Sequence, residues 1–112
     1  MLNKKIAVIG GQDTVLPFRT IGADSFQAES PLELAETLRR LASEGIYGII
    51  FVEENLAEPV IDVVADVNNH YRDVSVTPIP GASGQGGIAL KRLGEQVTRA
   101  IGIDIFAQKG GN

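Results

Sequence analysis

The sequence contains no cysteine and only one histidine, His70, among its 112 residues. The absence of cysteine excludes disulfide bonds, thiolate nucleophiles and cysteine-ligated zinc sites, and a single histidine excludes a histidine-rich metal centre. No apolar run approaches the ~18 residues of a membrane-spanning helix, and the N-terminal segment MLNKKIAVIG lacks the pattern of a signal peptide. These absences predict a cytoplasmic protein that inserts no segment directly into a membrane.

Basic residues are also scarce, and they are unevenly placed. The chain has 10 Lys and Arg against 14 Asp and Glu, a net charge of −4. Residues 1–87 hold six bases and twelve acids (net −6), whereas residues 88–112 hold four bases and two acids (net +2). No dense Lys/Arg stripe could displace counterions from phosphates, so nucleic acid is not an expected partner. The mildly basic end could instead help to orient the chain on a protein partner.

The residues that are present fit one globular domain. Hydrophobic residues make up 44% and charged residues 21% of the chain, close to the average of folded domains. Four runs have the composition of strands: residues 6–9, 23–28, 47–52 and 74–77. The run 47–52 is rich in β-branched and aromatic residues and is predicted to be central, whereas the more polar run 23–28 suits an edge. Pro78 is expected to end the fourth strand, because proline cannot donate to a ladder.

Capping residues mark helices between these strands. A capping-box pattern begins at Ser30 and predicts a helix that ends before Gly45. Two further helices are predicted to begin at the capping residues Asp13 and Asn55. The alternation predicts an α/β domain with the order β-α-β-α-β-α-β. The expected fold is a small flavodoxin- or receiver-like (Rossmann-like) parallel sheet of about four strands with flanking helices.

Beyond the fourth strand the composition changes. Residues 78–87 contain two prolines and four glycines, which predicts a hinge or linker. The glycines that would allow it to bend are Gly81, Gly84, Gly86 and Gly87. A linked C-terminal helix is predicted to follow, and its apolar stripe consists of Leu90, Leu93, Val97 and Ile101. The domain organisation is therefore an α/β core (1–77), a hinge (78–87) and a C-terminal helix and tail (88–112).

Two chemistries that α/β domains often carry are incomplete here. A phosphate-binding P-loop needs Gly-Lys-Ser/Thr, but Gly87 runs directly into Ile88. A receiver domain needs an aspartate at the end of the third strand, where Glu53 and Glu54 indicate a solvated helix entry instead. His70, near a helix C-terminus, fits a surface capping role. No catalytic, cofactor-binding or metal-binding residues are predicted.

Four segments resemble the F subunit of V-type (A/V-type) ATPases and ATP synthases. Residues 13–19, DTVLPFR, match the D-x-V-x-x-F-R opening of that family after an IAVIGG strand, and residues 47–54, YGIIFVEE, are similar to its GIIFITE segment. Residues 79–80 and 97–102, VTRAIG, resemble its IPS and V-x-x-A-I/V-G elements. The segments occur in order along essentially the whole chain. One departure is Gly81, where bacterial relatives often carry serine.

The resemblance implies a non-catalytic component of the central rotor stalk, which binds the coiled-coil D subunit within the hexamer of A and B subunits. ATP chemistry then belongs to A and B, and the chain is peripheral to the membrane through the complex. The residues predicted to contact a partner are Asp13, Phe18, Arg19, Leu90, Leu93, Val97 and Ile101. Phe18 is equally expected to pack against the sheet. The alternative is a stand-alone α/β signalling module that binds an anion or another ligand.

Overall fold

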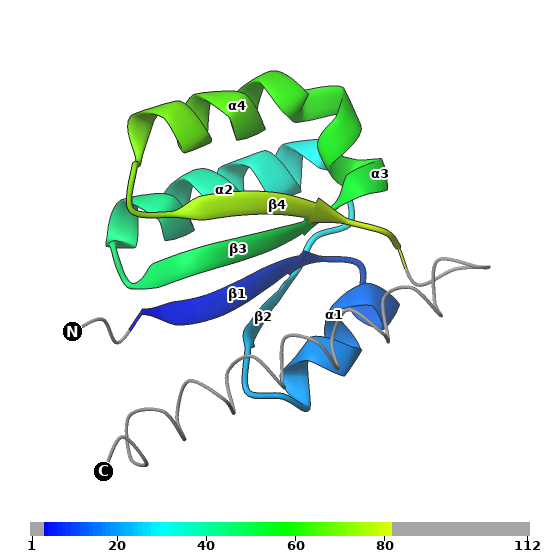
Figure 1. Ribbon diagram of the computed structural model, residues 1–112. Helices are drawn as coiled ribbons and strands as arrows, with labels where there is room; N and C mark the ends of the chain where they lie inside the picture. The colour runs from blue at the N-terminus through cyan, green and yellow to red at the C-terminus, as the bar shows by residue number, and fades with distance from the viewer. Residues whose placement is uncertain (1–3, 82–112) are drawn as a thin grey trace, which may run out of the picture.

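The computed structural model describes residues 4–81. Within this range, parallel strands form a 4-stranded sheet in the order β2-β1-β3-β4 (Figure 1). The strands are β1 (Lys5–Gly10), β2 (Asp24–Gln27), β3 (Tyr47–Glu53) and β4 (Ser75–Ile79). The parallel sheet, the inner position of β3 and the edge position of β2 confirm the predicted fold class.

Helices cover the two faces of the sheet unequally. They are α1 (Gln12–Arg19), α2 (Pro31–Glu44), α3 (Glu54–Ala57) and α4 (Ile61–His70), with a 3-10 turn, η1 (Glu58–Val60), between α3 and α4. Helices α2, α3 and α4 lie on one face, and of the described helices only α1 lies on the other (Figure 1). Because the strands are parallel, all their carboxyl ends lie at one end of the sheet, and the helices that follow them begin there.

Within residues 4–81, the apolar core consists of two clusters, one on each face of the sheet. The larger cluster attaches α2 and α4 through buried side chains that include Leu34, Leu38, Leu41, Ile50, Val64 and Val67. The smaller cluster attaches α1 through Val8, Val15, Phe18, Ala23, Phe51 and Ile79. Each fully buried side chain of this size stabilises the fold by about 1.5–3 kcal/mol before entropy is subtracted. Both helical layers are therefore fixed to the sheet by packing.

The predicted capping of α2 is confirmed. The backbone N–H of Glu33 donates to Ser30 Oγ at 3.2 Å, and Pro31 lies in the first turn. The Glu33 carboxylate accepts from the backbone N–H of Glu29 at 2.7 Å, one residue before the N–H that a capping box would use. Gly45 ends the helix with a φ of 76°, in the left-handed region that favours glycine.

Two predicted helix starts are wrong. Gly11, not Asp13, is the N-cap of α1, and no side chain caps it. The helix predicted from Asn55 is α3, η1 and α4 in succession, and Asn55 lies inside α3. Pro59 accounts for the interruption, because it has no N–H to donate to the carbonyl four residues earlier and a 3-10 turn forms around it.

Strand β4 passes through Pro78 and ends at Ile79, so the predicted strand end is also wrong. The backbone of Val76 points to the open edge of the sheet, where Asn68 accepts from its N–H at 2.9 Å and donates to its carbonyl at 3.2 Å. Backbone groups alternate in direction along a strand, so Pro78 also directs its nitrogen to this edge. Its missing N–H removes no ladder bond. The strand thus includes the first two residues of the segment 78–87 that the sequence predicts as a hinge.

Candidate functional site

The carboxyl ends of β1, β3 and β4 meet around the side chain of Glu53. In open α/β sheets this end is where ligands and partners bind. Glu53 is the last residue of β3 and is half-buried. Its Oε1 accepts a hydrogen bond from the backbone N–H of Gly11 at 2.9 Å. Gly11 is the N-cap of α1, so the carboxylate lies at the positive end of that helix.

Three glycines lie beside the Glu53 carboxylate. A Cβ on Gly10 would lie 3.0 Å from both the Cβ and the Oε1 of Glu53, and a Cβ on Gly81 would lie 3.0 Å from its Oε2. A Cβ on Gly11 would lie 3.5 Å from Oε1, which is an ordinary contact. The close approach of Glu53 therefore favours glycine at positions 10 and 81, while position 11 has room for alanine.

Gly81, one of the predicted hinge glycines, does not lie in the left-handed region of backbone conformation. Among the described residues, positive φ angles occur at Gly22 and Gly45, and Gly81 is buried. The proximity of Glu53 is what favours glycine there. The other predicted hinge and stripe residues lie outside residues 4–81: Gly84, Gly86, Gly87, Leu90, Leu93, Val97 and Ile101.

Helix α1 presents two of the predicted contact residues and buries the third. Asp13, in its first turn, and Arg19, in its last turn, are exposed. Phe18 is 0% exposed, and its ring centroid lies 5.4 Å from that of Phe51 on β3. The prediction of Phe18 as a contact residue is therefore corrected: its side chain holds α1 on the sheet and is not at the surface.

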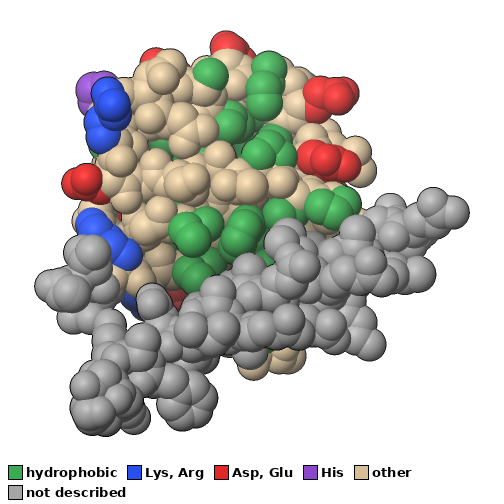
Figure 2. Space-filling model, in the orientation of Figure 1, with side chains coloured by type: hydrophobic (Ala, Val, Ile, Leu, Met, Phe, Trp, Pro, Cys, Tyr) green, Lys and Arg blue, Asp and Glu red, His purple; other side chains and the backbone are tan. Residues whose placement is uncertain are grey.

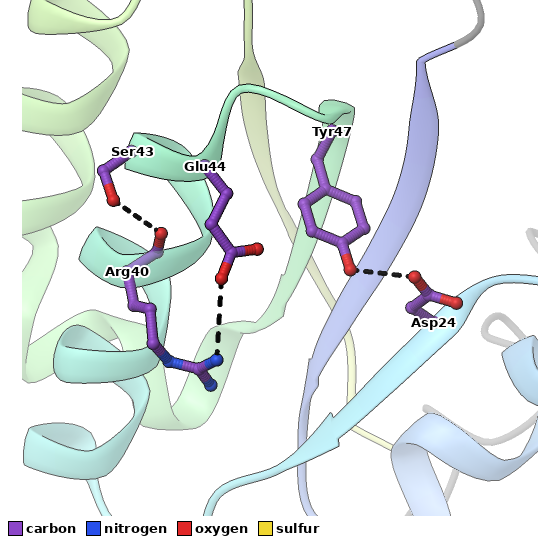
Figure 3. Close-up of polar contacts among 5 residues, drawn as sticks. All are labelled: Asp24, Arg40, Ser43, Glu44 and Tyr47. Atoms are coloured by element: carbon purple, nitrogen blue, oxygen red, sulfur yellow. Dashed lines mark hydrogen bonds and ion pairs between the residues drawn. The ribbon is translucent and has the colours of Figure 1, made fainter.

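The amino ends of the strands carry a different polar group. Figure 3 shows Tyr47 reaching past β1 toward Asp24 on β2, and its hydroxyl donates to Asp24 Oδ2 at 2.8 Å. The Lys5 ammonium lies 2.7 Å from the same oxygen. Hydrogen bonds from Lys5 and then Tyr47 lower the pKa of Asp24. Burial and the hydrogen bond to Asp24 raise the pKa of Tyr47 to about 12. This network joins the starts of β1, β2 and β3.

An open pocket lies at the same end, between the C-termini of α2 and α4. Its lining includes Lys4, His70 and Arg72, and Lys4 Nζ donates to the carbonyl of Gly45 at 2.5 Å. On the face shown in Figure 2, the Lys and Arg side chains lie at the same end as His70. Cations are favourable beside helix C-termini, and His70 is the exposed last residue of α4. The placement of His70 confirms its interpretation as a surface residue at a helix end.

Residues 4–81 bring together no metal-binding group. No set of three or more His, Asp and Glu side chains in this range could hold a metal ion. None of the described helices is long and apolar enough to cross a membrane. What the carboxyl end does offer is a polar site made of one carboxylate and backbone, beside an exposed helix.

Comparison with known proteins identifies the family. The sequence profile of the family described as ATP synthase (F/14-kDa) subunit matches residues 6–97. The chain belongs to this family. The F subunit of the V-type ATP synthase of Fusobacterium nucleatum is 39% identical over 102 residues, which cover 91% of this chain and 95% of the relative. The F subunit of the A-type ATP synthase of Thermococcus kodakarensis is 38% identical over 106 residues, which cover 90% and 97%. The F subunit of the V-type ATP synthase of Clostridium perfringens is 34% identical over 105 residues, which cover 92% of this chain and 96% of the relative.

In this member of the F-subunit family, the sequence interpretation missed the role of Glu53. It treats Glu53 and Glu54 alike, as a solvated helix entry. That is correct for Glu54, which is exposed, and wrong for Glu53, which is half-buried and bonded to Gly11. The available signal is a glycine near the carboxyl end of each strand beside β3: Gly10 is the last residue of β1, and Gly81 lies two residues after the end of β4.

Proposed function

We propose that the chain is the non-catalytic F subunit in the central rotor stalk of a V/A-type ATP synthase. It binds the D subunit, and the pair turns within the hexamer of A and B subunits. The observation that carries the proposal is the family match over residues 6–97, together with relatives of that name that align along nearly their whole length. In this role the chain helps to couple ATP synthesis or hydrolysis on A and B to ion transport. It lies on the cytoplasmic side, peripheral to the membrane through the complex.

Helix α1 supports the proposal as a contact element. Val15 and Phe18 are buried and fix the helix to the sheet, so its exposed side has a defined position. Asp13 and Arg19 are exposed at its two ends, and neither takes part in an ion pair with another residue of the range 4–81. No described residue neutralises either charge, and opposite charges at the two ends of a helix favour one orientation of docking on a partner.

The geometry around Glu53 argues against the alternative, a stand-alone module that binds an anion at the carboxyl ends of the strands. An anionic ligand in such a fold is held by backbone N–H groups at a helix N-terminus. At α1 the N–H of Gly11 already donates to Glu53 Oε1. A phosphate at this position would either displace the Glu53 carboxylate or lie close to it, where the two negative charges repel each other. Both cost free energy, so the interaction protein is the better-supported function.

The segment 88–101 is the second proposed contact element. Its four stripe residues require cover, and each contributes about 1.5–3 kcal/mol when buried. Either the chain's own sheet or the D subunit can provide that cover. Because β4 includes Pro78 and Ile79, we place the proposed hinge after these two residues, in the range 80–87.

The proposed contact through α1 is tested by the substitution Arg19→Ala. We expect the variant to keep the fold, because the side chain is exposed, and to weaken the association with the purified D subunit about tenfold through loss of a charged contact, as measured by isothermal titration calorimetry. The matched control is Arg72→Ala, since Arg72 is also exposed and follows α4, which covers the opposite face of the sheet from α1 (Figure 1). Equal affinities of the wild type and both variants would contradict a contact through Arg19.

A further inference from the structure

The Glu53 carboxylate lies between the start of α1 and Gly81, the last described residue before the C-terminal segment. One oxygen of its carboxylate, Oε1, accepts from the N–H of Gly11, the N-cap of α1. The other, Oε2, would lie 3.0 Å from a Cβ on Gly81, the last described residue before the C-terminal segment. The two oxygens therefore face chain segments that are distant in sequence, one that leads into α1 and one that leads toward residues 88–101.

The side chain of Glu53 serves this contact and not its own helix. Glu53 occupies the N-cap position of α3, but its carboxylate makes no capping hydrogen bond there. It lies instead near Gly11, which follows β1, and near Gly81, which follows β4, and β3 lies between these two strands in the sheet. Its backbone is also fixed, because Glu53 pairs with Ile79 in the β3–β4 ladder. A rigid strand end thus holds a carboxylate between its two neighbouring strands.

Among the described residues, backbone groups and not a cation stabilise this charge. None of the ion pairs within residues 4–81 includes Glu53. The N–H of Gly11 and the positive end of α1 provide the favourable electrostatic environment. A hydrogen bond from an N–H to a carboxylate is stronger than one between neutral groups. The contact therefore depends on the placement of Gly11, and Gly11 in turn sets where α1 begins.

From this geometry we propose that Glu53 is a positioning residue for docking. It holds the start of α1 and the start of the C-terminal segment in one arrangement, so that both elements meet the D subunit together. The part of this inference that concerns the D subunit rests on the function proposed above. The intramolecular part concerns only the isolated chain.

The intramolecular part is tested by amide hydrogen exchange at Gly11 in the full-length chain, followed by NMR. In Glu53→Ala we expect the Gly11 amide to exchange at least about tenfold faster, because its acceptor is gone. Glu54→Ala is the matched control, since it removes the same charge from the adjacent, exposed residue, and the rate should stay within about twofold of the wild type. An unchanged Gly11 rate in Glu53→Ala would overturn the proposal.

Gly81→Ala tests the same link from the other side. The added Cβ would press on Oε2, the flexible end of the Glu53 side chain, and should shift the carboxylate rather than unfold the domain. Faster exchange at Gly11, far away in sequence, is the expected result, and an unchanged rate would contradict the link. This variant and Glu53→Gln, which keeps an acceptor oxygen but removes the charge, decide the question if Glu53→Ala does not fold. For Glu53→Gln we expect an exchange rate between those of the wild type and Gly81→Ala.

The docking part is tested by the affinity of the same chains for the purified D subunit. We expect Glu53→Ala, or Gly81→Ala in its place, to bind about tenfold more weakly than the wild type, and Glu54→Ala to bind equally well. If the wild type binds the D subunit and the Glu53 and Gly81 variants bind it equally well, the positioning role of Glu53 alone is overturned. No binding of the wild type would overturn the proposed function, and with it the docking role of Glu53.

Discussion

At the amino ends of the strands, Asp24 is bound by two side chains, whereas at the carboxyl ends Glu53 is bound by a backbone N–H. The Asp24 carboxylate lies 2.7 Å from the Lys5 ammonium and 2.8 Å from the Tyr47 hydroxyl. The Glu53 carboxylate accepts from Gly11 and lies beside two glycines that leave room for it. The Asp24 carboxylate joins three strands through two side chains that can be replaced one at a time, whereas the Glu53 carboxylate joins β3 to the start of α1 through a backbone group.

This difference predicts unequal tolerance to substitution at the two ends. Loss of one partner of Asp24 leaves the other in place, and the group is partly open to water, so small changes in stability are expected. Around Glu53 the limiting factor is space. A single methyl group at the wrong glycine forces the side chain or the backbone to move, which costs more than an exposed ion pair.

The largest effect is expected for Gly10→Ala. The added Cβ would lie 3.0 Å from the Cβ of Glu53, an atom next to the backbone that cannot swing away. We expect the free energy of unfolding to fall by about 2 kcal/mol, measured by urea denaturation with circular dichroism. Gly11→Ala is the matched control, because its Cβ would lie 3.5 Å from Oε1, and a loss below about 1 kcal/mol is expected there. Equal losses of unfolding free energy in the two variants would contradict the claim that space beside Glu53 limits substitution at Gly10.

A smaller and pH-dependent effect is expected for Asp24→Asn. The pKa of Asp24 is lowered in the folded state by its hydrogen bonds to Lys5 and Tyr47, so the ionised group stabilises the fold above its unfolded pKa of about 3.9. That contribution is lost as the pH falls through the lower folded-state pKa. We expect the wild type to exceed the variant by about 0.5 kcal/mol at pH 7, since the pair is partly exposed.

Unfolding free energies measured over a range of pH test whether the ionised Asp24 stabilises the fold. The difference between the wild type and Asp24→Asn should shrink as the pH is lowered below about 3.9. Asp73→Asn is the control, because Asp73 is exposed and makes no ion pair with another described residue. A difference for Asp24→Asn that stays constant from pH 7 to pH 3 would show that its ionisation does not stabilise the fold.

The features that could be predicted from the sequence depend on neighbours along the chain. The capping of α2 by Ser30 and its end at Gly45 follow from residues within one turn of each helix end. The order of strands and helices follows from runs of apolar residues. Helix starts at Gly11 and around Pro59 were harder to predict, because a glycine N-cap gives little signal and a 3-10 turn joins two helices into one apparent pattern.

The candidate site could be predicted only in part. Asp13 and Arg19 are exposed on α1 as expected, because a short helix with three buried residues on one side must direct its charged residues outward. The contact of Glu53 with Gly11 could not be predicted, since it joins residues 42 positions apart and depends on the register of β3 between β1 and β4. The continuation of β4 through Pro78 could not be predicted either, because it depends on whether the backbone nitrogen of Pro78 faces the open edge of the sheet or the neighbouring strand.

The most direct test of the central claim, that this chain is a component of the rotor stalk, is co-purification of the tagged full-length chain from cells that produce the whole ATP synthase. We expect the D subunit to be recovered together with the A and B subunits, and calorimetry of the isolated chain to show no binding of ATP. Recovery of the chain without D, A and B, together with ATP affinity in the micromolar range, about −8 kcal/mol, would contradict that claim.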